Sequence, residues 1–302
     1  MGENMRIPYN GVVREGKGEC GMNQLSVPVG GNAKPYTATA ATARERSQKR
    51  SVSWRKRAGI VLVAMLVAAI LAPLLLTWAG NLWIDEQKLA AVQHPAKGVY
   101  VKLDEMPDYV WKAFVAIEDH RYMQHPGVDP YGLARAIWVD VREGAYVQGG
   151  STITMQLARN LFLTHDKTMG RKIKEMAIAL QLEQRYSKKE LLEMYLNVIY
   201  FGHGHYGIGE AAEFYFGKPV AAPGVGASTS LTMGETAILA SLPKAPEAYS
   251  PVKHWEKAKA RQQVVLDRMA ELHVIDQETL KQAKQEQVVV KAQSGLKPAL
   301  KQ

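Results

Sequence analysis

Residues 171–197 read RKIKEMAIALQLEQRYSKKELLEMYLN, and this stretch decides the fold because it holds two consecutive helices and the signal that separates them. Ile178, Ala179 and Leu182 share one face at helical spacing, which predicts a helix over about 169–186. The next four residues, Ser187-Lys-Lys-Glu190, match a capping box, in which two side chains satisfy the free N–H groups of a helix start. A second helix is therefore expected to about Ile199.

The same helical pattern continues on both sides of this stretch. Further helices are predicted over 109–120, 131–143, 152–163 (with Ser151 as its N-cap), 210–216, 233–241 and 253–272, and a shorter one after residue 276. A glycine-rich loop is expected over 202–209. Only 98–103 and 288–291 suggest short strands. The sequence therefore predicts a mainly α domain over 81–275, followed by a C-terminal helix and tail over 276–302.

N-terminal to this domain, residues 59–80 (GIVLVAMLVAAILAPLLLTWAG) form an uncharged run of 22 residues, long enough to cross a membrane as one helix. A basic juxtamembrane collar over 44–58 precedes the run with seven Arg and Lys residues, whereas the twenty residues after it hold only two. This asymmetry predicts a single-pass protein with a cytoplasmic N-terminus and residues 81–302 outside. A cleaved signal peptide is the alternative, disfavoured because the run is long and far from the N-terminus.

Composition restricts the remaining possibilities. The chain has 302 residues and a formal net charge of +9, part of which the collar explains, so nucleic acid is not an expected partner. Residues 1–43 contain seven glycines and three prolines without apolar periodicity, which predicts a disordered cytoplasmic tail. The single cysteine, Cys20, lies in that tail and excludes an intrachain disulfide.

Glu118 is the first candidate for chemistry. On its expected helix it shares a face with Trp111, Phe114 and Val115. An apolar setting desolvates a carboxylate and raises its pKa, which suits it to accept a proton near neutral pH. The alternative is a solvated acid at the end of a surface helix.

Glu175 is the second candidate. It follows Arg171 by four residues and Lys172 by three, a spacing that also suits an ordinary ion pair on a helix surface. Its face carries Ile178 and Leu182, so the pair is expected to be partly buried. The ion-pair and the chemical interpretation both remain open.

The turn Gly149-Gly150-Ser151 leads into the helix between these two acids. A glycine turn at a helix start presents free N–H groups and the positive end of the helix dipole, which together bind anions. Such turns are also common caps. Combined with Arg159, Arg171 and Lys172, the turn indicates a phosphate or pyrophosphate pocket.

Five segments resemble successive signature blocks of the peptidoglycan glycosyltransferases, glycosyltransferase family 51. They are AIEDHRYMQHPGVDP (116–130), QGGSTITMQLARNLFL (148–163), the opening stretch 171–197, YFGHGHYGIGEAAEFYFGK (200–218) and ASLPKAPEAYSP (240–251). Their order and spacing match as well, and the similarity covers roughly residues 82–275.

The resemblance implies a lysozyme-like helical glycosyltransferase domain behind a single transmembrane helix, held at the bacterial cytoplasmic (inner) membrane with its catalytic domain on the periplasmic side. It implies an inverting enzyme that polymerises lipid II into β-1,4-linked glycan strands and releases undecaprenyl pyrophosphate. The expected partners are lipid II, the growing strand and the membrane. Other cell-wall synthesis and division proteins are further candidates. Without a second domain, the chain is most similar to the monofunctional biosynthetic transglycosylases.

The resemblance also assigns roles to residues. Glu118 matches the general base, and Glu175 matches a second glutamate that stabilises the sugars or helps to hold a metal or the pyrophosphate. Substrate-binding or supporting positions fall on Asp119, His125, Thr152, Gln156, Arg159, Arg171 and Lys172. The resemblance implies that the enzyme requires no cofactor. It allows a divalent cation such as Mg²⁺ to bind near the pyrophosphate.

The chain departs from the family pattern at three positions, of which one, Arg159 in place of the common lysine, preserves the charge. Tyr122 replaces the usual phenylalanine, and Met155 replaces the first of two glutamines, so no amide hydrogen bond is available there. His203 and His205 lie in the glycine-rich loop and are not expected to bind a metal. Two other functions stay open: a lysozyme-like enzyme that cleaves murein, and a non-catalytic scaffold of wall synthesis.

Overall fold

The computed structural model describes residues 40–93, 100–144, 149–164, 166, 168–220 and 230–291, with the backbone alone described for 40–53 and 55. The chain divides into two units, Met1–Leu62 and Val63–Gln302. Within the first unit the described part is helical. The expected disordered tail over 1–43 lies outside the described residues except at 40–43, where the chain is already helical.

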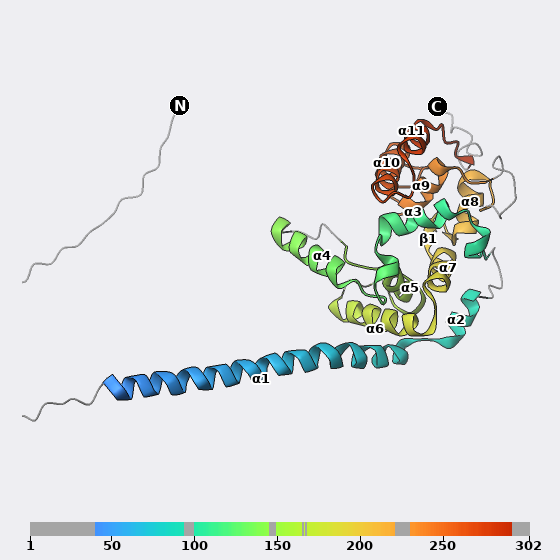
Figure 1. The fold of residues 1–302 in the computed structure, drawn as a ribbon. Helices are drawn as coiled ribbons and strands as arrows, with labels where there is room; N and C mark the ends of the chain where they lie inside the picture. The colour runs from blue at the N-terminus through green and yellow to red at the C-terminus, as the bar shows by residue number, and fades with distance from the viewer. Residues whose placement is uncertain are drawn as a thin grey trace, which may run out of the picture. The chain divides into compact units, whose positions relative to one another are not determined.

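Helix α1 (Ala40–Gly80) contains both the basic collar and the apolar run (Figure 1). It is the one helix in the described chain that is long and apolar enough to cross a membrane, over Lys56–Trp83, and its apolar side chains are exposed. Pro73 lies inside the helix without ending it, and its carbonyl accepts a hydrogen bond from the Thr77 hydroxyl at 2.7 Å. The helix fits the expected transmembrane segment.

The second unit is mainly helical, as the sequence predicts. After α1 come η1 (Asn81–Trp83), α2 (Glu86–Gln93), η2 (Leu103–Glu105), α3 (Asp108–Glu118), η3 (Tyr122–Gln124), α4 (Pro130–Glu143), α5 (Ile153–Phe162), α6 (Met169–Arg185), α7 (Lys188–Val198), β1 (Tyr200–Gly202), β2 (His205–Tyr206), α8 (Ile208–Phe216), α9 (Met233–Ser241), α10 (Trp255–Glu271) and α11 (Gln277–Gln285). The expected helices all occur, with ends shifted by one or two residues.

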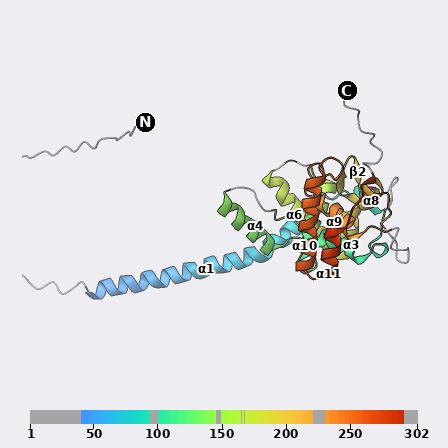
Figure 2. The same ribbon diagram turned by 90° about the horizontal axis from the view of Figure 1, so that it is seen from above.

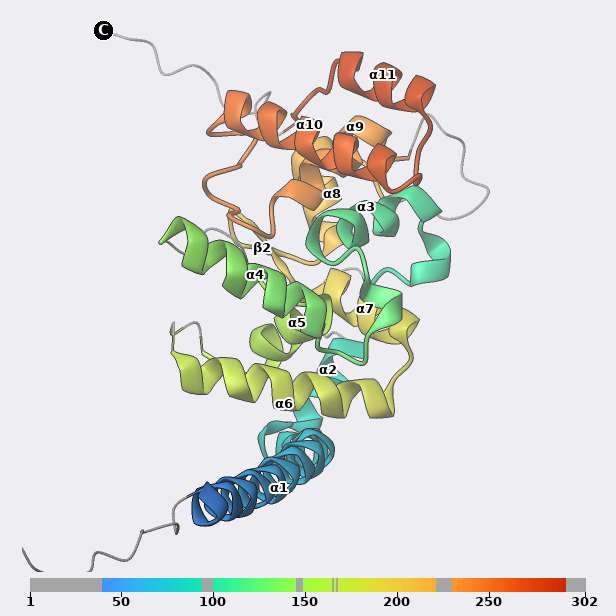
Figure 3. The same cartoon turned by 60° about the vertical axis from the view of Figure 1, so that its left-hand side comes forward.

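These helices pack as two neighbouring groups. Helices α3, α9 and α10 contact one another, and α5 contacts both α6 and α7 (Figure 3). Seen from above, α11 lies along α10 (Figure 2). Helix α9 is buried on all sides, which explains why its sequence has few polar residues. The core thus fixes the end of α3 against the start of α5, where the first two signature segments meet.

The turn between α6 and α7 forms as the opening stretch predicts. The Ser187 hydroxyl accepts the Glu190 backbone N–H at 3.3 Å, and the Glu190 carboxylate accepts the Ser187 N–H at 2.7 Å. This reciprocal pair stops α6 and starts α7 within three residues. The capping-box prediction is confirmed.

The predicted strands over 98–103 and 288–291 are absent from the part of each segment that the structure describes. The two strands found in the described chain form a hairpin in the expected glycine loop, where Tyr200 pairs with Tyr206. Positive φ angles at Gly202 and Gly204 permit this tight turn. In the predicted strand over 98–103, the Val101 backbone instead bonds to the Asn197 amide, through N–H at 2.9 Å and carbonyl at 2.8 Å. No strand forms over 288–291 either.

The expected N-cap of α5 is also wrong by one residue. Thr152, not Ser151, is the N-cap: its backbone angles are extended, and its hydroxyl oxygen accepts the Met155 N–H at 3.1 Å. Ser151 accepts a hydrogen bond from Lys172 on α6 instead. Both residues are good caps in isolation, so the sequence pattern alone cannot choose between them.

Candidate active site

A cleft of about 560 Å³ lies between the two helix groups. Its described lining residues include one carboxylate, Glu118, and several cationic side chains. The cations are Arg135 on α4, Arg159 on α5, Lys244 after α9, and Arg261 and Arg268 on α10. A lone acid surrounded by positive charge suits the binding of an anionic ligand next to a group that can take a proton.

Glu118 is the last residue of α3 and is half-buried at this cleft. Its Oε2 accepts a hydrogen bond from Nε2 of Gln156 at 2.8 Å. Burial raises the pKa of Glu118, while the Gln156 hydrogen bond and the charges of Arg261, Lys244 and Arg159 act in the opposite direction. The raised pKa agrees with the desolvated setting expected from the apolar face of the helix, and contradicts the solvated alternative.

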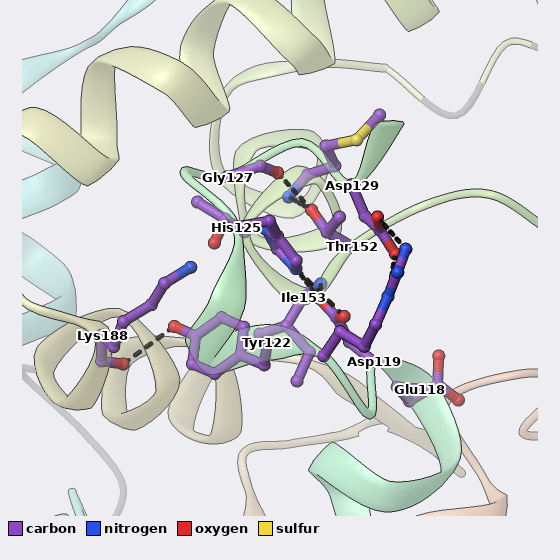
Figure 4. A network of polar contacts seen from close by, with 12 residues as sticks. Glu118, Asp119, Tyr122, His125, Gly127, Asp129, Thr152, Ile153 and Lys188 are labelled. Atoms are coloured by element: carbon purple, nitrogen blue, oxygen red, sulfur yellow. Dashed lines mark hydrogen bonds and ion pairs between the residues drawn. The ribbon is translucent and has the colours of Figure 1, made fainter. Parts of the chain in front are cut away.

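Asp119 lies behind the cleft and joins α3 to α5. Its carboxylate oxygens lie 3.0 and 3.1 Å from Nε2 of His125, and it accepts the Ile153 N–H at 3.1 Å (Figure 4). The Thr152 hydroxyl donates to the Gly127 carbonyl at 2.5 Å. These residues are buried, and Figure 4 shows the Glu118 carboxylate pointing away from them. They therefore support the site from within the protein.

The departure at Tyr122 has a clear structural explanation. Its ring is fully buried, and its hydroxyl donates to the Lys188 carbonyl at the start of α7, at 2.8 Å (Figure 4). A phenylalanine at this position has no hydroxyl and could not donate this hydrogen bond. Met155 is similarly buried in the core, where a thioether needs no hydrogen bond.

Glu175 is completely buried and belongs to a separate charged cluster. Its two carboxylate oxygens accept hydrogen bonds from Arg171 and from Lys172, the latter at 2.9 Å. Lys172 also bonds to the Ser151 hydroxyl, so the cluster ties the turn before α5 to helix α6. Glu175 is not among the residues that line the cleft. The ion pair is therefore present, and a catalytic role for Glu175 stays a prediction.

The remaining sequence-predicted residues occupy three different positions relative to the cleft. Gln156 and Arg159 line the cleft with Glu118; Asp119, His125 and Thr152 lie behind it; Arg171 and Lys172 belong to the Glu175 cluster. The Nε atoms of Arg159 and Arg261 have no hydrogen-bond partner among the described residues. Both side chains line the cleft, so their guanidinium groups place positive charge beside an anionic ligand.

The sequence analysis did not select five of the ionisable residues that line the cleft: His120, Arg135, Lys244, Arg261 and Arg268. Arg261 and Arg268 are seven residues apart on α10, so they share one face, but that spacing is equally typical of a solvated helix surface. Lys244 lies in a signature block without an assigned role. Burial and the nearby arginines lower the pKa of His120, which keeps it neutral near pH 7.

The histidines of the hairpin have other partners. His203 Nε2 lies 2.8 Å from the Ser250 hydroxyl, and the His205 ring stacks on Phe214 with ring centroids 4.1 Å apart. Among the described residues no cluster of three or more His, Cys, Asp or Glu side chains has the arrangement of a metal site. The two histidines thus have structural contacts.

A helical domain with one desolvated carboxylate in a cationic cleft defines a class of protein equipped to bind an anionic substrate and remove a proton from it. Sequence comparison identifies the family: the model described as Transglycosylase matches residues 85–270. The chain belongs to the transglycosylase family.

Several penicillin-binding proteins are similar to this chain. Penicillin-binding protein 1F of Bacillus subtilis (strain 168) is 42% identical over 227 residues, 70% of this chain and 30% of that protein. Penicillin-binding protein 1A is 45% identical over 201 residues in Aquifex aeolicus (strain VF5), with 67% and 27% coverage, and 44% identical over 208 residues in Escherichia coli (strain K12), with 69% and 24% coverage. The chain thus spans less than a third of the length of these relatives.

Proposed function

We propose that this chain is a peptidoglycan glycosyltransferase that polymerises lipid II into β-1,4-linked glycan strands and releases undecaprenyl pyrophosphate. Membership of the transglycosylase family supports the class of reaction. The observation that carries the proposal is the position of Glu118, a desolvated carboxylate at a cleft whose other charged lining residues are cationic. Lipid II carries a pyrophosphate beside the sugar that reacts, so its chemistry matches this pairing.

In the proposed reaction, Glu118 acts as the general base. Its carboxylate takes the proton from the 4-hydroxyl of the acceptor N-acetylglucosamine while that oxygen attacks C1 of the donor N-acetylmuramic acid. The bond from C1 to the pyrophosphate oxygen breaks, and the configuration at C1 inverts from α to β. A carboxylate with a raised pKa is a stronger base once ionised, which favours this proton transfer.

The cationic side chains serve the leaving group. Negative charge grows on the pyrophosphate as its bond to C1 breaks, and fixed guanidinium and ammonium groups stabilise that charge in the transition state. Arg159 and Arg261 are suited to this task because their side chains line the cleft and their charges act on Glu118. We assign Arg171 and Lys172 a supporting role, in which Glu175 bonds to both and Lys172 also bonds to the turn that precedes α5.

The decisive experiment incubates the purified full chain with lipid II and separates the products by size. Polymer formed by the wild type and lost in Glu118→Gln is the expected result. Glu278→Gln, an exposed acid on α11, is the matched control and should polymerise normally. Absence of polymer from the wild type, or normal polymerisation by Glu118→Gln, contradicts the proposal. Shortening of preformed glycan strands would identify a murein-cleaving enzyme instead.

We also propose that the chain crosses the bacterial cytoplasmic membrane once, with its N-terminus in the cytoplasm. The support is the apolar span over Lys56–Trp83 and the collar of basic residues before it. A reporter enzyme that is active only outside the cytoplasm should work when fused after residue 291 and fail when fused at residue 1. The reverse pattern rules out this orientation.

The proposed reaction needs no resident metal. Glu118 is the only carboxylate among the described lining residues of the cleft, and Mg²⁺ prefers several oxygen ligands. We therefore place any contribution of Mg²⁺ on the pyrophosphate oxygens of the substrate. Polymerisation should persist, at a lower rate, in the presence of a chelator. Complete and reversible loss of activity on chelation points to a protein-bound ion.

A further inference from the structure

Tyr195 on α7 is a buried polar group that the proposed reaction does not yet use. Its side chain is 0% exposed, and its hydroxyl donates to Oε1 of Gln156 at 3.3 Å. Gln156 is the only hydrogen-bond partner of this hydroxyl among the described residues. Since Nε2 of the same amide donates to Glu118 at 2.8 Å, a chain of hydrogen bonds runs from α7 through α5 to the end of α3.

The two ends of the Gln156 amide are chemically different. Its oxygen only accepts and its nitrogen only donates hydrogen bonds, so the observed orientation presents N–H to the Glu118 carboxylate. If the amide turned over, its oxygen would face the carboxylate oxygen, and the two would repel each other. An ionised Glu118 therefore favours the observed orientation by itself.

Tyr195 matters when Glu118 has taken up a proton. A protonated carboxyl group can donate to an amide oxygen as well as accept from an amide N–H, so Glu118 alone would then permit either orientation of the amide. In the reversed orientation the Tyr195 hydroxyl proton would face an N–H group and lose its acceptor inside the protein, which costs about 1–3 kcal/mol. Burial and the charge of Glu118 also raise the pKa of Tyr195, so its hydroxyl remains a donor. Tyr195 thus keeps the amide in one orientation throughout.

We propose that Tyr195 is a positioning residue for glycosyl transfer, which acts through Gln156 to keep an N–H donor on Glu118. The N–H donor bonds more strongly to the ionised carboxylate than to the neutral acid, so it favours the return of Glu118 to its proton-accepting state after each proton transfer. This proposal rests on the proposed function, because it assigns Tyr195 to the same proton-accepting step.

The test compares lipid II polymerisation by the full-length wild type and Tyr195→Phe as a function of pH. Without the Tyr195 hydroxyl, the Gln156 amide is free to turn away from Glu118. The carboxylate then loses its N–H donor and its pKa rises, so the acid limb of the kcat profile should move to higher pH by about one unit. At a pH on that limb kcat should fall about tenfold while KM changes by less than about twofold. Tyr215→Phe is the matched control: Tyr215 is equally buried and its hydroxyl donates to the Phe201 carbonyl at 2.8 Å, away from Glu118.

A second variant separates this role from a loss of folding. Gln156→Leu removes the amide and should produce the same displacement of the acid limb, and adding Tyr195→Phe to it should have no further effect on that limb. A Tyr195→Phe profile that coincides with the wild type and Tyr215→Phe overturns the proposal, as does an additive shift in the double variant. If the wild type itself makes no polymer, the proposed function fails instead.

Discussion

At the scale of single residues, the burial that raises the pKa of Glu118 also lowers the stability of the folded protein at neutral pH. Burial raises the pKa of this carboxyl group, so the folded protein holds its proton more tightly than the unfolded chain does. The folded state is therefore relatively more stable at low pH, and this contribution is lost as pH rises from the unfolded to the folded pKa. A buried acid that costs stability at neutral pH is typical of a functional site.

Replacement of Glu118 should therefore stabilise the protein while it stops polymerisation. In Glu118→Gln the uncharged amide still accepts the Gln156 hydrogen bond but pays no cost for a buried charge. We expect its Tm at pH 8 to exceed that of the wild type by about 2–4 °C. The difference should vanish below about pH 4, where the wild-type carboxyl is protonated. Thermal unfolding in detergent at both pH values measures this, and a lower Tm at pH 8 contradicts it.

Glu175 should behave in the opposite way. Its buried carboxylate has an Arg171 partner and a Lys172 partner, whose side chains are 16% and 23% exposed. Glu175→Gln leaves both cations without their counter-charge, which should destabilise the fold by about 2–3 kcal/mol, toward the low end for a buried pair. Thermal unfolding beside Glu278→Gln provides the measurement. Unchanged stability combined with lost polymerisation favours a direct catalytic role for Glu175.

At the scale of elements, the start of α5 shows how one residue can decide the geometry of a site. Thr152 caps the helix and bonds to the Gly127 carbonyl, while Asp119 accepts the N–H of the next residue, Ile153. One turn further along, Gln156 reaches Glu118. The cap and the catalytic contact are therefore parts of one connection between α3 and α5.

Removal of this cap should weaken both stability and activity. Thr152→Ala loses the acceptor for the Met155 N–H and the donor to Gly127, so we expect a cost of about 1–2 kcal/mol. Ser151→Ala is the matched comparison and should leave the cap intact, because its hydroxyl bonds to Lys172 instead. Chemical denaturation of both variants tests the assignment. A larger loss in Ser151→Ala would favour the cap that the sequence pattern suggested.

At the scale of the whole molecule, α4 presents an exposed apolar surface formed by Tyr131, Ile137, Trp138 and Val141. Trp138 is 70% exposed and Val141 is 76% exposed, whereas Trp111 packs partly against the core. On a protein that we propose to act on a lipid-linked substrate, such an exposed apolar surface is expected to contact the membrane.

A spin label can test this contact. We expect a label on Val141→Cys, in a Cys20→Ser background in vesicles, to be accessible to oxygen and protected from a water-soluble nickel reagent. A label on Glu278→Cys, on α11, should show the reverse. Equal exposure of both sites to the aqueous reagent would show that α4 stays in water. The experiment requires no assumption about catalysis.

The sequence by itself determined the helical fold, the long apolar helix, the α6–α7 boundary and the choice of Glu118 as the candidate base. These features depend on local periodicity, caps and uncharged length, which a linear pattern records directly. Tertiary structure alone decided that Thr152 rather than Ser151 caps α5, and that the Val101 backbone bonds to Asn197 instead of joining a strand. It alone also brought Arg261 and Arg268 beside Arg159 around Glu118. Each of these depends on which groups from distant segments meet, because hydrogen bonds and charges are satisfied in space and not along the chain.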